Sequence, residues 1–211
     1  MSLWSRLGRW LTAHHGLPLV ALRDVGFLAI DLETTGLDTR RDAIVAFAAI
    51  PFVRSEPAPG LVTLVDPGRP IPLASTAIHG LTDAMVAGAP SVDRVVGDLD
   101  GLFDDRIVVG HGVDFDLTII NRERNVRGLP RLANPALDTQ RLAAAICPEW
   151  RDYALESVAA RLGVEVVGRH TAPGDALAAG RVLLALLPLL ESGGVRTVNE
   201  LMWLQRWRVA H

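Results

Sequence analysis

Two acidic residues, Asp31 and Glu33, are the first candidates for chemistry in this 211-residue chain. They follow an apolar run at 25–30 that has the length of a strand. Alternate side chains of a strand share a face, so both carboxylates would point the same way, ~6–7 Å apart along the backbone. Two like charges at this spacing repel each other unless a cation neutralises them. The pair therefore predicts either a divalent-metal site or a solvated turn at the end of the strand.

A second acidic segment follows a short apolar run at 106–110 that predicts a buried strand. Residues 110–116 read Gly-His-Gly-Val-Asp-Phe-Asp and open a predicted helix. Asp114 suits the helix N-terminus, because the helix dipole favours carboxylates there. Asp116 comes one position after an apolar phenylalanine and can turn inward. Asp116 is therefore the candidate for chemistry in this segment.

A third segment, His-Thr-Ala-Pro-Gly-Asp at 170–175, starts a long helix rich in alanine and leucine. His170 and Asp175 are five residues apart across the start of this helix, so both side chains can approach one site. A histidine just before a helix is more often a surface or capping residue than a catalyst. This segment alone leaves both interpretations of His170 open.

Together with Asp-Leu-Glu-Thr-Thr-Gly at 31–36 and Ile-His-Gly-Leu-Thr at 78–82, these segments resemble the DEDDh 3′–5′ exonucleases, which are similar to polymerase proofreading subunits. The ordered motifs cover residues 26–190. The resemblance implies a ribonuclease H-like fold and hydrolysis of phosphodiester bonds at the 3′ end of single-stranded nucleic acid, with DNA favoured. Nucleoside 5′-monophosphates would be released. RNA and short oligonucleotides are the alternative substrates.

The resemblance also implies roles for individual residues. His170 would be the general base, since histidine ordinarily titrates near pH ~6.5 and can take a proton from water. Two divalent ions, ~3.5–4 Å apart, would suit in-line phosphoryl displacement, and hard oxygen ligands favour Mg²⁺ or Mn²⁺. The expected metal ligands are Asp31, Glu33, Asp116 and Asp175. The expected contacts to the terminal nucleotide are Thr34, Thr35, Gly36, Leu37, His79, Leu81, His111 and Phe115.

Three positions limit this interpretation. Members of the family commonly have asparagine where this chain has Gly112, a difference that removes no metal ligand. Phe115 could stack on a base, but packing of its helix on the sheet explains it equally well. Asp138 resembles an acid that the family often has near its last strand, but an N-cap of the helix that starts at Thr139 also explains it.

The pattern of elements predicts an α/β fold with three layers, in which helices flank a mixed five-stranded sheet. The first three strands would form an antiparallel meander, and residues 66–72 an extended linker before a short helix capped by Thr82. Strands are expected at 26–31, 43–52, 60–66, 106–110 and 135–137. Helices are expected at 92–103, 114–125, 153–162 and 172–190, with one more starting at 139. The expected organisation is an N-terminal helix at 1–20, an exonuclease domain at 26–190 and a helical tail at 191–211.

Composition narrows the class of protein. With 49% hydrophobic and 21% charged residues, the chain is expected to be a soluble globular protein. Its net charge of −3 argues against non-specific coating of DNA. The single cysteine, Cys147, excludes an intrachain disulfide and fits a packed thiol in the cytoplasm. No apolar run reaches the ~18 residues of a transmembrane helix, so none is expected.

The two ends of the chain suggest protein contacts. Leu3, Trp4, Leu7, Trp10 and Leu11 fall on one stripe of an amphipathic helix. This helix could pack on the domain or a partner, lie on a membrane surface, or be a cleaved presequence. A polymerase or another protein is the expected partner of the terminal helices. The alternative of another class is a binding module for nucleic acid or polymerase that has little activity of its own.

Overall fold

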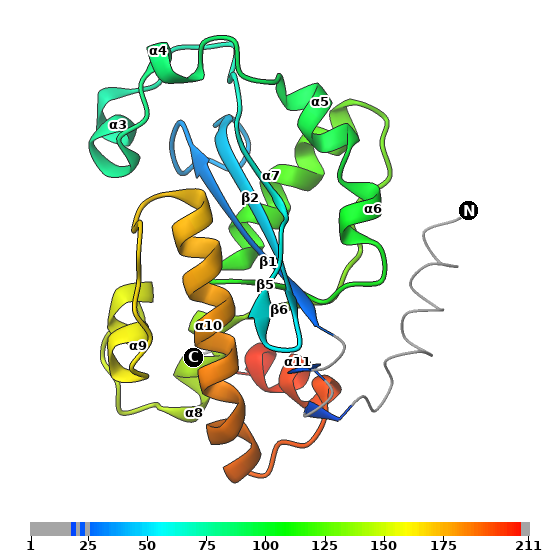
Figure 1. Ribbon diagram of the computed structural model, residues 1–211, viewed down its shortest axis with the longest axis vertical. Helices are drawn as coiled ribbons and strands as arrows, with labels where there is room; N and C mark the ends of the chain where they lie inside the picture. The colour runs from blue at the N-terminus through cyan, green and yellow to red at the C-terminus, as the bar shows by residue number, and fades with distance from the viewer. Residues whose placement is uncertain (1–17, 20–21, 24–25, 208–211) are drawn as a thin grey trace.

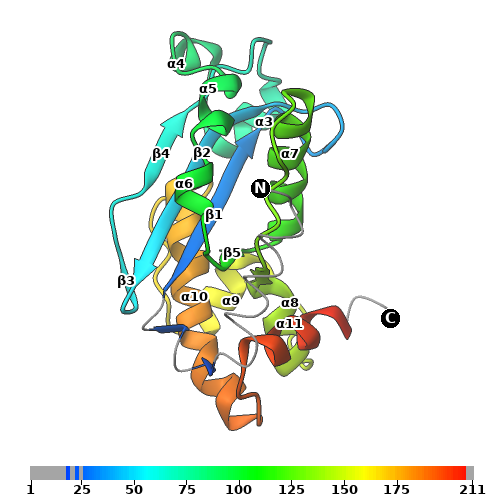
Figure 2. The same ribbon diagram turned by 90° about the vertical axis from the view of Figure 1, so that its right-hand side faces the viewer.

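The computed structural model describes residues 18–19, 22–23 and 26–207, and its centre is a mixed sheet between helices (Figures 1 and 2). The strands are β1 (Phe27–Thr34), β2 (Ile44–Val53), β3 (Glu56–Pro57), β4 (Leu61–Leu64), β5 (Val108–Gly110) and β6 (Ala136–Asp138). Their order is β3-β2-β1-β5-β6, and β4 also pairs with β2. The pairs that involve β2 are antiparallel, whereas β1–β5 and β5–β6 are parallel. The predicted α/β architecture is confirmed, with six strands rather than five because of the two-residue β3.

The helices largely follow the predicted pattern. They are α3 (Leu73–His79), α4 (Asp83–Val86), α5 (Val92–Gly97), α6 (Asp100–Phe103), α7 (Val113–Val126), α8 (Thr139–Ile146), α9 (Leu155–Arg161), α10 (Ala172–Ser192) and α11 (Val198–Trp207). Helix α3 was not predicted, since its seven residues are too few to show a helical period. The helix expected at 92–103 is interrupted after Gly97, so it forms the short helices α5 and α6.

Strand β1 separates two hydrophobic clusters, one on each face of the sheet. Phe27 and Ala29 pack in the cluster that includes residues of α8, α9, α10 and α11. Leu28, Ile30 and Leu32 pack in the other cluster, with residues of α5, α6 and α7. Because side chains alternate along a strand, the next odd-numbered residues, Asp31 and Glu33, continue the face that α10 covers.

Helix α10 packs closely on the sheet. A Cβ atom at Gly180 would lie 2.3 Å from the ring of Phe52, so glycine allows the helix to approach β2. Phe52 in turn stacks on Phe27, with 4.8 Å between ring centroids. In the described part of the chain, α10 is the one helix long and apolar enough to cross a membrane by length and composition. In the most apolar stretch of α10, 61% is buried inside the fold. Packing within the protein therefore explains the apolar composition of this helix.

The C-terminal helix α11 packs on α8 and closes the sheet edge at β6. The Gln205 side chain accepts a hydrogen bond from the backbone of Asp138 (2.9 Å) and donates one to the carbonyl of Ala136 (2.7 Å). These bonds satisfy backbone groups at the free edge of a strand. The helix expected at 1–20 lies mostly outside the described residues. Leu19, one of its described residues, donates a backbone hydrogen bond to the carbonyl of Arg196, in the segment that leads into α11.

Candidate active site

Strand β1 carries the first two acids of the site. It was predicted to end at residue 31, but it continues to Thr34 because β2 pairs with it along its whole length, Glu33 lying opposite Ala46. The register shifts between Glu33 and Thr34, so the irregularity comes directly after the second acid. Both carboxylates therefore have a fixed strand backbone beneath them.

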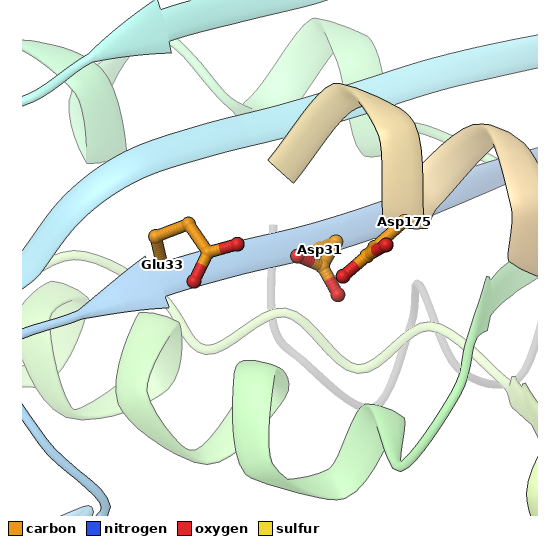
Figure 3. Close-up of side chains that lie close together, drawn as sticks. All are labelled: Asp31, Glu33 and Asp175. Atoms are coloured by element: carbon orange, nitrogen blue, oxygen red, sulfur yellow. The ribbon is translucent and has the colours of Figure 1, made fainter. Parts of the chain in front are cut away.

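The third acid comes from the first turn of α10. Thr171 caps this helix, its hydroxyl accepting a hydrogen bond from the backbone of Gly174, and Pro173 lies in the first turn. This start brings Asp175 over β1. Carboxylate oxygens of Asp31, Glu33 and Asp175 lie within 4.8 Å of one another. Figure 3 shows the three side chains between β1 and the start of α10.

Asp116 reaches the same part of β1 from α7. Strand β5 pairs with β1 only at Leu28 and Ala29, so the next part of this β1 edge has no strand partner. There the backbone of Leu32 donates a hydrogen bond to Asp116 Oδ1 at 3.1 Å. The side chain of Asp116 turns inward as predicted and is 5% exposed. It lies beside the three-acid cluster, and its charge raises the pKa of Asp31.

The electrostatics of the cluster favour a cation. Burial is the main reason that the pKa of Asp31 is raised well above its ordinary value, and neighbouring acids raise it further. Burial and the charge of Asp175 raise the pKa of Glu33 to about 7. Asp175 Oδ1 is buried and has no hydrogen-bond partner among the described residues. Crowded carboxylates with an unpartnered oxygen are a donor set that fits a divalent metal ion.

Arg169 is a residue of this site that the motifs did not identify. Its guanidinium group donates a hydrogen bond to Asp175 and lies 2.5 Å from Glu156 Oε1 on α9. The charge of Arg169 lowers the pKa values of both Asp31 and Glu33, so it partly balances the acids. The sequence signal for Arg169 is its position directly before His170. Its acidic partner Glu156 lies on a separate helix, so the motif does not contain the pair.

His170 lies next to this ion pair. Its backbone has φ +59°, the left-handed region that non-glycine residues rarely occupy. The side chain is 44% exposed, and its Nε2 is 4.0 Å from Glu156 Oε1. The structure therefore places His170 at the rim of the carboxylate cluster, accessible from solvent.

A cavity of about 360 Å³ lies beside the cluster. Glu33 and His170 form part of its wall, together with His79 and Leu81. His79 is held by a hydrogen bond from the backbone of Leu81 to its Nδ1 (3.0 Å), and burial lowers its pKa. The remaining walls are mainly apolar: Ala46, Val62, Thr63, Leu64, Thr171, Ala172 and Pro173. His79 and Leu81, two of the expected nucleotide contacts, therefore line the same cavity as His170, the expected general base.

The last residue of β1 and the turn after it contain four more of the expected contacts. The Thr34 hydroxyl bonds to the carbonyl of Gly36, and the Thr35 hydroxyl bonds to Asp42, so both stabilise the turn. Leu37 is 85% exposed at its outer side. None of the four lines the cavity described above, and their contact with a nucleotide stays a prediction.

His111 and Phe115 lie apart from this cavity. Nδ1 and Nε2 of His111 are 2.9 Å from the hydroxyl of Thr139 and 2.8 Å from the carbonyl of Tyr153, so both ring nitrogens have protein partners. Phe115 packs on the cluster between α7 and the sheet. Their predicted contacts with substrate are not tested by this arrangement.

Gly112, which departs from the family pattern, and Asp138, which resembles a family acid, both have local explanations. Gly112 has φ +80°, a conformation that suits glycine and, among other residues, asparagine. Its backbone donates to Asp138 Oδ1 at 3.1 Å. Asp138 also accepts hydrogen bonds from Gln140 and Arg141, which confirms that it caps α8.

A family model described as exonuclease matches residues 28–183, which include every acid of the site. The chain belongs to this exonuclease family. The DNA polymerase III subunit epsilon of Aquifex aeolicus, 34% identical over 167 residues, matches 79% of the chain and 82% of its own length. An epsilon-like protein of Rhodobacter capsulatus is 39% identical over 181 residues, 83% of the chain. The chain spans 26% of that relative, and 12% of a PolC-type DNA polymerase III of Streptococcus suis.

Solved exonucleases have the same fold. E. coli exonuclease I in complex with a dT13 oligonucleotide superposes with a TM-score of 0.70 at 19% identity, covering 80% of this chain and 42% of that one. Exonuclease X in complex with 5′ overhanging duplex DNA gives 0.67 at 23% identity, covering 85% and 99%. These likenesses confirm the predicted ribonuclease H-like fold.

Proposed function

We propose that this member of the exonuclease family is a metal-dependent 3′–5′ exonuclease that releases nucleoside 5′-monophosphates from single-stranded nucleic acid, with DNA favoured. The observation that carries the proposal is the cluster of Asp31, Glu33 and Asp175, with carboxylate oxygens within 4.8 Å of one another beside a cavity. The names of the relatives support DNA as substrate, since they include an epsilon subunit of DNA polymerase III.

Asp31, Glu33, Asp175 and the adjacent Asp116 would hold two divalent ions, Mg²⁺ or Mn²⁺. The unpartnered Oδ1 of Asp175 and the repulsion among the acids support this assignment. When bound, the metal supplies a lowered pKa for the attacking water and neutralises charge at the phosphate. Arg169 contacts Asp175 Oδ2, which leaves Oδ1 of the same carboxylate available to a metal ion.

His170 takes the proton from the attacking water. It is accessible from the cavity and has no hydrogen bond from the described residues that would fix its ring. Glu156, 4.0 Å from its Nε2, can stabilise the imidazolium that forms. The reaction then breaks the bond between phosphorus and the 3′ oxygen of the preceding nucleotide.

The cavity beside Glu33 would receive the terminal nucleotide. Its volume lies within the ~300–1,000 Å³ range of small-molecule sites, and its apolar walls suit a sugar and base. His79 and Leu81 would form one side of this pocket. A polymerase bound through the terminal helices and a cytoplasmic location remain further predictions.

A digestion assay tests the proposal. Purified protein is incubated with 5′-labelled single-stranded DNA, single-stranded RNA or duplex DNA with a mismatched 3′ end. We expect shortening from the 3′ end in Mg²⁺ or Mn²⁺, complete inhibition by EDTA, and faster digestion of DNA than of RNA. Faster digestion of RNA would identify the alternative substrate.

The matched control is Asp31→Asn, which keeps the size of the side chain and removes its charge. It should fold normally and lose nearly all hydrolysis, so equal activity of wild type and variant would indicate a contaminating nuclease. Absence of metal-dependent hydrolysis by the pure wild-type protein would contradict the proposed function.

A further inference from the structure

A second cavity, of about 350 Å³, lies on the far side of the turn that follows β1. Its walls come from this turn, from the segment after β4, from the start of α5 and from the second half of α7. Arginines dominate its charged lining, with Glu123 as the single acid in it. The five arginines are Arg40, Arg41, Arg69, Arg122 and Arg127. This concentration of positive charge contrasts with the net charge of −3 of the chain.

Two of these arginines are committed to the structure. Arg122 donates to the carbonyls of Thr39 and Asp42 and pairs with Glu123. Arg127 pairs with both Glu123 and Asp93. Together they form a rigid wall whose charge is largely balanced.

The other three arginines keep their charge available. Arg41 has a loose contact of 3.9 Å with Asp38 and a side chain that is 86% exposed. The guanidinium group of Arg69 donates a hydrogen bond to the backbone carbonyl of Arg41. This carbonyl is neutral, so it does not balance the charge of Arg69. The exposed Arg40 makes no ion pair with any described residue. The cavity is therefore a partly enclosed site with excess positive charge.

The position of the cavity connects it to the candidate active site. Arg40 and Arg41 are on the turn that follows Thr34, the last residue of β1, and Thr34 comes directly after Glu33. Arg122 on α7 and Arg127 directly after its end are six and eleven residues beyond Asp116, an axial rise of ~9 and ~16 Å. A strand whose 3′ end reaches the acids could therefore bring phosphates farther from that end to this cavity.

We propose that this arginine cavity binds backbone phosphates of the nucleic acid strand whose 3′ end occupies the active site. The inference rests on the proposed exonuclease function and adds an anchoring site distant from the reacting phosphate. Guanidinium groups suit phosphate oxygens, and backbone contacts position a strand without reading its sequence.

The test compares substrates that do and do not reach the cavity. The double variant Arg40→Gln/Arg41→Gln removes two charges from exposed side chains. For a 12-nucleotide single strand, its KM should rise on the order of tenfold at unchanged kcat. For a dinucleotide, which ends before the cavity, KM should not change. The slope of log KM against log NaCl should fall by about 0.7 for each phosphate that the variant no longer binds.

The matched control is Arg54→Gln/Arg151→Gln, which removes two charges at exposed positions elsewhere. Arg54 follows the far end of β2, ~30 Å along the strand from Ile44 in the cavity wall. This control should retain the wild-type KM for both substrates.

Unchanged KM for the 12-nucleotide strand in the cavity variant would overturn the inference and leave an acidic protein as the better candidate ligand. An equal rise of KM for both substrates, or an equal rise in the control, would also overturn it. Failure of the wild-type protein to hydrolyse either substrate would instead contradict the proposed function. The two failures are therefore distinguishable.

Discussion

Helix α7 buries one acid and one arginine, and their surroundings differ. Asp116, at its start, is 5% exposed and lies near Asp31 and Glu33, whose charges have the same sign. Arg124, eight residues later, is 1% exposed and donates to the carbonyls of Val96 and Pro130 and to Asp100. The arginine is satisfied by the fold itself. Asp116 and the acids near it carry negative charge that the described residues neutralise only in part.

This difference separates a structural charge from a functional one. Burying a charged group is costly unless partners compensate it. Around Arg124 the compensation is complete and needs no ligand. Around Asp116 and its neighbours it depends on Arg169 and on a cation from outside. Substitutions at the two ends of α7 should therefore have opposite consequences for stability and activity.

The largest effect is expected for Asp116→Asn. The amide oxygen can still accept the hydrogen bond from Leu32, and removal of a negative charge relieves repulsion with Asp31. Activity should fall at least ~10³-fold, since metal-bound charge stabilisation contributes several kcal/mol and ~1.4 kcal/mol is tenfold in rate. The thermal midpoint of the metal-free variant should equal or exceed that of the wild type. Single-turnover digestion and thermal unfolding in EDTA measure the two quantities.

Asp114→Asn is the matched control on the same turn of the helix. Asp114 is 61% exposed and pairs with Arg141 at the surface. Its loss should leave hydrolysis within about twofold, because exposed ion pairs contribute little. Loss of activity in both variants would indicate damage to α7 rather than loss of a metal ligand.

The next effect in size is on stability alone. Arg124→Met leaves two carbonyl groups without their donor, and each unsatisfied buried group costs ~1–3 kcal/mol. The free energy of unfolding should fall by roughly 2–5 kcal/mol in urea titrations, while kcat of the folded enzyme stays unchanged. Arg127→Met is the control, since Arg127 is 22% exposed and its ion pairs lie nearer the surface. A loss from Arg127→Met as large as that from Arg124→Met would show that burial does not set the effect.

The sequence predicted the carboxylate face but not its electrostatic environment. The two-residue period of β1 placed Asp31 and Glu33 on one face, and the structure has them on the α10 face with Asp175. The alternation depends on local geometry, so it can be read from neighbouring residues. The full ligand set of four acids and the role of His170 remain predictions that rest on the family resemblance.

Arg169 and Glu156 show what a sequence pattern leaves out. Their ion pair joins α9 to the start of α10, and it forms only when both helices pack on the same face of the sheet. No spacing rule links residues on separate elements. The predicted end of β1 at residue 31 was also wrong, because pairing with β2 continues the strand to Thr34. In both cases a tertiary contact decides the local structure.

The smallest predicted effect is a pH dependence of stability that comes from Glu33, one of the clustered acids. The pKa of Glu33 is raised to about 7 in the metal-free fold, above its ordinary 4.5. The folded protein therefore binds this proton more tightly than the unfolded chain does. The resulting stability is fully present below pH 4.5 and is lost as pH rises through about 7. Burial lowers the pKa values of His79 and His111. Acidification therefore lowers stability through these two histidines, the opposite of its effect through Glu33.

Comparison with Glu33→Gln isolates the acid from these histidines, which both proteins share. In EDTA, the melting temperature of the wild type should rise relative to that of Glu33→Gln as pH is lowered from 8 to 6. Saturating Mg²⁺ should remove this relative shift, because a bound cation stabilises the ionised carboxylate. Arg124→Met should show the same pH profile as the wild type, since Arg124 contacts none of the clustered acids. A relative shift that persists in Mg²⁺ would mean that Glu33 does not contact the metal.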